Sequence, residues 1–162
     1  MAIYMDYEGL KGNVTAMGYE GMIALDFFAF GVRRKISMKA GELANRETTK
    51  PNFSVITTGK RQDGASAGIL REAVSGSTGK QVKIHFVRTG NNQLQEYLTY
   101  TFQRCLPTFY RTVDTRSEAS AAAERLYLSY TAVEVSYTDS GADNKTLGVH
   151  RHGYDLAAAK SL

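Results

Sequence analysis

The chain has 162 residues, 43% of them hydrophobic and 22% charged, which fits one globular domain spanning residues 1–162. Its formal net charge of +4 is too small to indicate nucleic-acid binding without a focused basic patch. Because Cys105 is the only cysteine, an intrachain disulfide and a cysteine-rich zinc site are excluded, and we expect Cys105 to be a small buried or half-buried residue on a strand.

The first residues give no sign of membrane targeting. Residues 1–8 contain no basic region followed by an apolar core, so a Sec-type signal peptide is not expected. No apolar stretch reaches the length that spans a bilayer. We therefore expect the chain to be made and folded in the cytoplasm, and export by a signal-independent route would leave no trace in the sequence.

Two strands are expected in the first 34 residues. Ile3, Met5 and Tyr7 alternate with more polar neighbours, which is the period of a strand. Residues 9–21 include four glycines and predict a turn or an irregular segment. Residues 22–34 predict a second strand with both sides covered, because apolar residues occur on both of its faces. We expect Ile23, Leu25, Phe27 and Ala29 on one face, and Ala24, Asp26, Phe28 and Phe30 on the other.

A basic segment follows the second strand. From Arg33 to Arg61 there are eight basic residues and two acidic ones. Residues 35–50 lack a regular period and predict a long excursion from the body of the domain, either a loop or a hairpin. Two interpretations stay open: a solvated loop, or a contact surface for an acidic partner or a neighbouring subunit.

The pattern indicates one helix. Strand-like sequence resumes at residues 52–58, and residues 65–75 then place apolar residues at helical spacing. We expect Asp63 or Ser66 to cap the start of this helix and Gly76 to follow its end. The apolar stripe is expected to consist of Ile69, Leu70, Ala73 and Val74.

Long strands dominate the second half of the chain. Residues 81–88 and 93–104 predict a hairpin joined by a turn at residues 89–92, where Gly and Asn tolerate positive φ. In the second of these strands a core face alternates with a polar wall. The core face comprises Leu94, Leu98, Tyr100 and Phe102, and the polar wall comprises Gln95, Thr99, Thr101 and Gln103, with Tyr97 on the same side.

The alternation changes phase farther along the chain. Apolar residues share one face up to Tyr130 and the opposite face from Val133 onward. A β-bulge near Thr131–Ala132, or a bend between two sheets, would explain the change. Residues 149–156 predict a last strand, and residues 156–162 are expected to fray or to be weakly helical.

No catalytic, cofactor-binding or metal-binding site emerges from the sequence. His150 and His152 have the i, i+2 spacing of one strand face, and Asp155 could complete a metal site, but an exposed loop or edge is the favoured interpretation. The glycines of residues 75–80 follow the helix instead of preceding one, so they do not form a phosphate loop. No serine or carboxylate is marked as half of a nucleophile–base pair. Tyrosine-rich strands could stack nucleic-acid bases, yet the tyrosines are spread over both faces.

Four stretches, taken in order, resemble the haemolysin-coregulated protein (Hcp) family. Residues 23–31 form an apolar–aromatic strand that ends in glycine before a long loop, and residues 60–66 lead into the helix. Residues 93–98 place a Glu–Tyr pair in the strand after the hairpin. Residues 124–137, followed by Gly153-Tyr154-Asp155, resemble the family's final strands. The chain departs from the family in lacking tryptophan, and the residues at those places are Phe28, Phe30 and Tyr154.

The resemblance implies a mainly β fold, a compact β-barrel of two antiparallel sheets with one flanking α-helix and a long extended loop. It also implies a non-enzymatic subunit of the type VI secretion inner tube. Such a subunit forms hexameric rings that stack into a tube, is exported with the spike, and carries or chaperones small effectors in its lumen. The implied partners are further copies of the chain and the spike, sheath and baseplate of the machine. No cofactor, nucleic acid or membrane insertion is implied.

Two candidate surfaces follow. The basic segment suits a contact between rings, which needs two different complementary surfaces on one subunit, and we expect it to meet Glu118, Asp139 or Asp143 of the next ring. The candidate stacking residues are Arg33, Arg34, Lys35, Asn45, Arg46 and Lys50, and the candidate lumen or wall residues are Gln95, Thr99, Thr101 and Gln103. The alternative function is a monomeric β-barrel module that binds a ligand or single-stranded nucleic acid.

Overall fold

The computed structural model describes residues 1–36, 40–41, 50–90, 93–113, 123–141 and 146–162. Most of this described chain is antiparallel strand, and it includes one helix of 10 residues. The elements are β1 (Ala2–Tyr7), β2 (Ile23–Leu25), β3 (Phe27–Ala29), β4 (Val32–Arg33), β5 (Asn52–Phe53), β6 (Ile56–Arg61), α1 (Ser66–Ser75), β7 (Lys80–Gly90), β8 (Gln93–Val113), β9 (Ala123–Ser129), β10 (Ala132–Ser140), β11 (Thr146–Asp155) and β12 (Lys160–Ser161).

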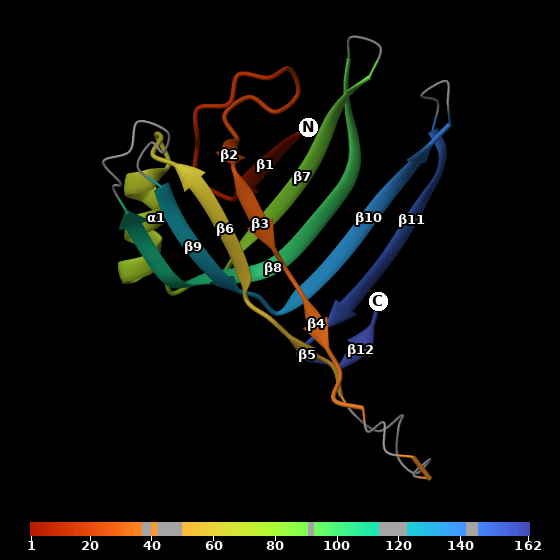
Figure 1. Ribbon diagram of the computed structural model, residues 1–162. Coiled ribbons are helices and arrows are strands. Elements are labelled where there is room, and N and C mark those ends of the chain that lie inside the picture. The colour runs from red at the N-terminus through yellow and green to blue at the C-terminus, as the bar shows by residue number, and fades with distance from the viewer. Residues whose placement is uncertain (37–39, 42–49, 91–92, 114–122, 142–145) are drawn as a thin grey trace.

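The strands form two antiparallel sheets that share β8 (Figure 1). The first sheet has the order β12-β11-β10-β8-β7-β1-β2, and the second has the order β3-β6-β9-β8. A separate ladder joins β4 to β5. The predicted architecture of two antiparallel sheets with one flanking helix is confirmed. Among the described strands the ladders do not close into a complete barrel, because β2 ends the first sheet and β3 ends the second.

A single residue, Asp26, takes the chain from the first sheet to the second. Its backbone N–H donates to the carbonyl of Gly59, 2.8 Å away. Leu25 is buried before this step, whereas Phe28 packs against the core after it. The prediction of one strand over residues 22–34 is therefore wrong. The apolar residues on both of its faces reflect a change of sheet, not one strand covered on both sides.

A bend within β8 lets one strand serve both sheets. Arg104 adopts φ 51°, in the left-handed region, where the pairing of β8 passes from β7 and β10 to β9. Gly79 lies against this bend, and a Cβ atom there would be 2.7 Å from the Arg104 Cα. Cys105 follows the bend and is fully buried on the strand, as predicted, and burial raises the pKa of its thiol to about 12. The strand expected to end at residue 104 thus continues to Val113.

The phase change predicted between Tyr130 and Val133 is the passage from β9 in the second sheet to β10 in the first. At the crossing, the backbone N–H of Thr131 donates to the carbonyl of Gln103, 2.9 Å away. The expected bend between sheets is therefore confirmed. The weakly helical tail expected for residues 156–162 is wrong, because these residues form a turn and then β12, which pairs with β11.

Helix α1 forms where it is predicted, and most of its apolar stripe is exposed. Gly76 follows its last residue, and the Gly76 N–H donates back to a carbonyl of the last turn over 2.9 Å. No side chain caps the first turn, and Asp63 instead accepts from the backbone N–H of Ala65 at 2.9 Å. Ile69 is the buried residue of the helix. The rest of the predicted stripe is exposed, namely Leu70, Ala73 and Val74.

The core between the sheets is aromatic at its centre. The ring of Phe30 lies 5.6 Å from the rings of both Tyr100 and Phe102, and the rings of Phe102 and Tyr130 are 5.0 Å apart. Pairs of this kind each contribute about 0.5–1.5 kcal/mol beyond their area burial. Buried aliphatic residues surround the rings, among them Met5, Ile23, Ile56, Ile69, Val82, Ile84, Leu126 and Leu128.

Candidate assembly surfaces

The β4–β5 ladder forms the base of the basic segment. Val32 pairs with Phe53 and Arg33 with Asn52, so the chain leaves the body and returns to it as an antiparallel pair. Figure 1 places this ladder at the opposite end of the molecule from the last residues of β7 and β10. The expected hairpin form of the excursion is thus confirmed at its base.

Four of the six candidate stacking residues lie in the described part of this segment. Arg33, Arg34, Lys35 and Lys50 are all exposed. Asn45 and Arg46 lie outside the described residues. Positive charge is therefore gathered beside the β4–β5 ladder, and its contact with another ring stays a prediction.

The outward face of the first sheet is polar where β7, β8 and β10 run side by side. Phe102 is fully buried on the inner face of β8, so its neighbours Thr101 and Gln103 point outward. Thr99 is on the same side by the alternation of the strand. The outward row consists of Thr99, Thr101 and Gln103 on β8, Lys83 and His85 on β7, and Glu134 and Ser136 on β10. Three of the four predicted wall residues thus share one polar face.

Gln95 does not belong to this face. A β-bulge at Tyr97 shifts the register between β7 and β8 by one residue. Beyond the bulge Gln95 pairs with Arg88, on the side of the core residue Phe86, and Glu96 takes the outward position. The prediction that placed Gln95 with the other wall residues is wrong, because simple alternation does not include the extra residue of the bulge.

A cluster that the sequence did not indicate lies beside the polar wall. Nδ1 of His85 is 2.6 Å from Oε2 of Glu96, and the Thr99 hydroxyl donates to Oε1 of the same carboxylate. Tyr19, from residues 9–21, packs its ring 5.8 Å from the imidazole and donates its hydroxyl to Glu96 over 3.5 Å. The hydrogen bond from His85 holds the pKa of Glu96 below its ordinary value, although burial acts in the opposite direction. The cluster therefore holds residues 9–21 against the outward face of the first sheet.

A second unpredicted cluster is buried between the second sheet and the start of α1. Nζ of Lys60 lies 2.6 Å from Oε2 of Glu124 and 2.8 Å from Oδ1 of Asp63. It also donates to the Ser66 hydroxyl over 3.2 Å, while the Tyr110 hydroxyl donates to Oε1 of Glu124 over 2.8 Å. Burial by itself raises the pKa of Glu124, but the hydrogen bonds from Lys60 and Tyr110 bring it below its ordinary value. The cluster therefore holds the start of α1, through Asp63 and Ser66, against the second sheet.

An apolar groove of about 450 Å³ opens beside β4 and β5. One of its walls is the inner face of β10 and β11, and the other is formed by β4, β5 and the end of β3. Arg34 and His152 also border it. Its apolar lining includes Phe30, Val32, Phe53, Val133, Val135 and Tyr154. The sequence did not indicate this groove, because its walls come from segments that are far apart along the chain.

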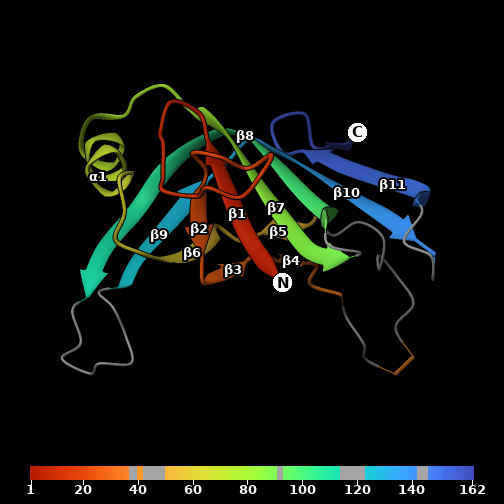
Figure 2. The same cartoon turned by 90° about the horizontal axis from the view of Figure 1, so that it is seen from above.

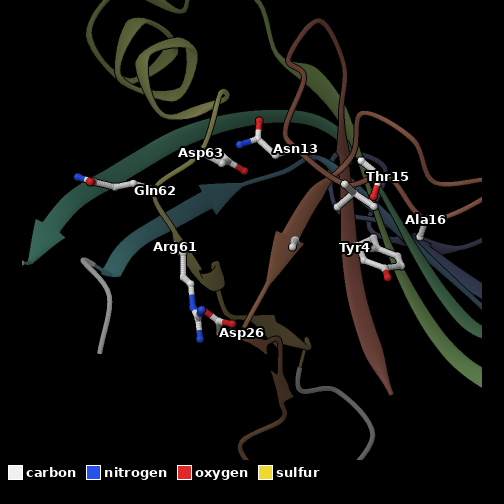
Figure 3. A pocket seen from close by; sticks show the side chains of 10 residues that line it. Tyr4, Asn13, Thr15, Ala16, Asp26, Arg61, Gln62 and Asp63 are labelled. Carbon is white, nitrogen blue, oxygen red and sulfur yellow. The ribbon is translucent and has the colours of Figure 1, made fainter. Parts of the chain in front are cut away.

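An open polar hollow of about 470 Å³ lies between residues 9–21 and the end of β6 (Figure 3). Arg61 and Asp26 point toward one another there, with 3.9 Å between Nε and Oδ2, and both side chains are mostly exposed. Asp63 also borders the hollow, but its carboxylate is engaged with Lys60. The described side chains of the hollow thus offer one solvated ion pair and no pairing of a nucleophile with a base.

His150 and His152 both lie on β11 and are exposed. Within the described ranges, no group of three or more His, Cys, Asp or Glu side chains is placed to hold a metal ion. No helix in the described part of the chain is long and apolar enough to cross a membrane. The histidine pair is a surface feature of an outer strand.

In the described part of the chain, two antiparallel sheets that share one bent strand, with a single flanking helix, define a mainly β protein. Residues 4–137 match the family model described as type VI secretion system effector, Hcp. Because the match covers most of the chain, the protein belongs to the Hcp family, as the four sequence stretches indicated. Family membership makes it a tube-type protein of type VI secretion.

Solved structures share the fold. One, described as a type six secretion system protein, aligns with a TM-score of 0.90 at 20% identity over 99% of both chains. Hcp1 from Salmonella typhimurium aligns with a TM-score of 0.80 at 22% identity, over 99% of this chain and 98% of that one. A type VI secretion system effector from Yersinia pestis aligns with a TM-score of 0.74 at 18% identity, over 94% and 98%. No curated protein sequence matches the chain.

Proposed function

We propose that this protein is a non-enzymatic subunit of the type VI secretion inner tube. It assembles into hexameric rings that stack into a tube, and it carries small effector proteins in the lumen. It is made in the bacterial cytoplasm and leaves the cell with the spike by a route that needs no signal peptide. Its other partners are the sheath and the baseplate of the machine.

The observation that supports this proposal most directly is the polar outward face of the first sheet. Thr99, Thr101 and Gln103 alternate on β8 with Tyr100, which packs against the core, and Phe102, which is fully buried, so one side of the strand is polar and the other faces the core. A channel wall requires this division, because water and cargo touch one face only. An oligonucleotide-binding face would instead need aromatic rings among basic residues on one surface.

Stacking is supported by the separation of charges along the molecule. Exposed basic residues flank the β4–β5 ladder at one end, and Asp139 lies near the last residue of β10 at the other (Figure 1). Two different surfaces at opposite ends are what a head-to-tail contact needs. Glu118 and Asp143, the other expected partners of the basic segment, lie outside the described residues.

The test is the native mass of the purified protein by light scattering, followed by negative-stain microscopy. We expect a mass of about six subunits and ring-shaped particles, as closed cyclic symmetry requires. A folded monomer at all concentrations would overturn the proposal. If that monomer bound oligonucleotides with a steep salt dependence, the alternative of a nucleic-acid-binding module would replace it.

A further inference from the structure

Helix α1 presents an apolar stripe to solvent. Leu70 is 50% exposed and Val74 is 78% exposed, and they lie one turn apart on the same side of the helix. Ala73 beside them is also exposed. A helix on the surface of a globular domain normally turns such a stripe toward the core. Here Ile69 alone is buried, so the amphipathic pattern of the helix is not explained by packing within one subunit.

The apolar groove has the chemistry and the dimensions to receive such a stripe. Leu70 and Val74 are separated by about 6 Å along the helix axis. Val133 and Val135, on the groove wall, are separated by about 7 Å along β10. Val32, on the facing wall, is 56% exposed. The groove therefore offers apolar walls over the length of one helical turn.

The stripe and the groove lie on opposite sides of the molecule. Figure 2 shows α1 at one side and β11 with the C-terminus at the other, with the two sheets between them. Two different surfaces on opposite sides form a heterologous contact, which closes into a ring when the rotation between subunits allows it. This chain carries both the α1 stripe and the apolar groove, so the stripe of one copy can pack into the groove of a second copy.

We propose that α1 of one subunit packs Leu70 and Val74 into the apolar groove of the next subunit around the ring. This inference rests on the proposed hexamer and specifies which surfaces build it. The mode is a helix laid in a hydrophobic groove, anchored by residues one turn apart. Arg34 and His152 border the groove and remain at the polar rim of the contact.

The first experiment introduces a charge into each half of the contact. Val74→Asp and Val32→Asp should each lower the native mass from about six subunits to one, because an unpaired carboxylate would have to be buried. Met17→Asp is the matched control: Met17 is an apolar residue of residues 9–21 that is 85% exposed and belongs to neither surface, so its mass should be unchanged. Circular dichroism establishes that each variant is folded. The pair Val74→Asp with Val32→Lys should recover the larger mass.

The second experiment detects the contact by cross-linking, so its result does not depend on a substitution that disrupts the interface. Cys105 is fully buried, so cysteines introduced at the surface are the reactive ones. Val74→Cys combined with Val32→Cys, or with Ser161→Cys at the same groove, should form covalent chains of up to about six subunits on oxidation. Met17→Cys combined with Val32→Cys should form none.

The outcomes separate this inference from the proposed function. A ring that persists in Val74→Asp, and that gives no cross-links in either double-cysteine variant, overturns the helix–groove contact while the tube function stands. A wild-type protein that is monomeric overturns both. Loss of the ring in Val74→Asp together with cross-linking through Val32 or Ser161 supports both.

Discussion

Lys60 and Glu124 face one another across the β6–β9 ladder, with 2.6 Å between Nζ and Oε2 and both side chains 1% exposed. The pair is completed by Asp63, which joins it from the start of α1. A buried pair of this kind contributes little net stability over an apolar pair, because desolvation offsets the attraction. Removing one partner is different, since the other charge then stays buried without compensation.

We therefore predict that Lys60→Met lowers the free energy of unfolding by about 3–5 kcal/mol. Combining Lys60→Met with Glu124→Leu should recover part of that loss, because the Glu124 charge is no longer buried alone, whereas Asp63 still loses its cation and Tyr110 its acceptor. Urea denaturation followed by circular dichroism measures both values. Tyr110→Phe provides a smaller reference change, about 1–2 kcal/mol, since it removes one hydrogen bond to the same carboxylate. Equal losses in the single and double variants would contradict this account.

The lowered pKa of Glu96 predicts a pH dependence for the contact between residues 9–21 and β8. His85, Thr99 and Tyr19 face this carboxylate, and the hydrogen bond from His85 is the largest cause of the shift. A carboxyl group whose pKa is lower in the folded state stabilises that state above its unfolded pKa, about 4.3. This contribution disappears as the pH falls through the folded value.

The expected result is faster amide hydrogen exchange near Tyr19 below about pH 4 than at pH 6, after correction for the intrinsic pH dependence of exchange. In Glu96→Gln the corrected protection at pH 6 should be weaker than in the unmodified protein, and it should change little between pH 6 and the lower pH. Asp6→Asn, at an exposed position of β1, is the control and should behave as the unmodified protein does. If wild-type protection near Tyr19 were the same at both pH values, the Glu96 carboxylate would not be what holds residues 9–21 against β8.

The sequence predicts the type and order of most elements, because long alternating strands and one helical stripe give clear periods. It does not predict where the chain changes sheet. The chain passes between the sheets at Asp26, and β8 bends at Arg104. At both residues the backbone conformation depends on pairing with another strand. In the sequence, the apolar alternation before and after each residue looks like one continuous strand. The change at Thr131 was visible because its neighbours are strongly apolar on opposite faces.

The candidate surfaces were predictable only in part. The exposed basic residues beside β4 could be found from composition, since charge is conspicuous without knowledge of the fold. The bulge at Tyr97 leaves no signal in the sequence, so simple alternation places Gln95 on the wrong face and does not predict the contact between His85 and Glu96. The apolar stripe on α1 is predictable from its period, but its exposure is not, because periodicity shows which residues share a face and not what covers that face.

If the basic segment forms the stacking surface, substitutions there should prevent rings from stacking into tubes while single rings still form. Reversing the charge of Arg33 and Arg34 to Glu should shorten or abolish tubes seen by negative-stain microscopy, because like charges would then oppose Asp139 and its neighbours on the next ring. The native mass in dilute solution should stay at about six subunits, because Arg34 lies only at the polar rim of the helix–groove contact and Arg33 does not line that groove. Adding Arg46→Glu should strengthen the effect.

Lys11→Glu is the control for net charge, since Lys11 is exposed and lies outside the basic segment. It should leave tube length unchanged. Tubes of normal length in the Arg33→Glu, Arg34→Glu variant would remove the basic segment from the stacking contact. Loss of the ring itself would mean that the segment serves the ring instead.

The contact of Gly79 with the bend at Arg104 predicts a large effect from a small substitution. A Cβ atom at residue 79 would lie 2.7 Å from three backbone atoms of Arg104, and backbone cannot move aside as a side chain can. Gly79→Ala should therefore lower the free energy of unfolding by roughly 1–3 kcal/mol, or more if the bend is lost. Gly31→Ala is the matched control, because its nearest neighbour would be a side-chain oxygen of Ser54 at 3.8 Å, and it should change stability by less than about 0.5 kcal/mol. Equal denaturation midpoints for the two variants would mean that the bend tolerates a side chain, and that β8 can reach both sheets without a glycine beside it.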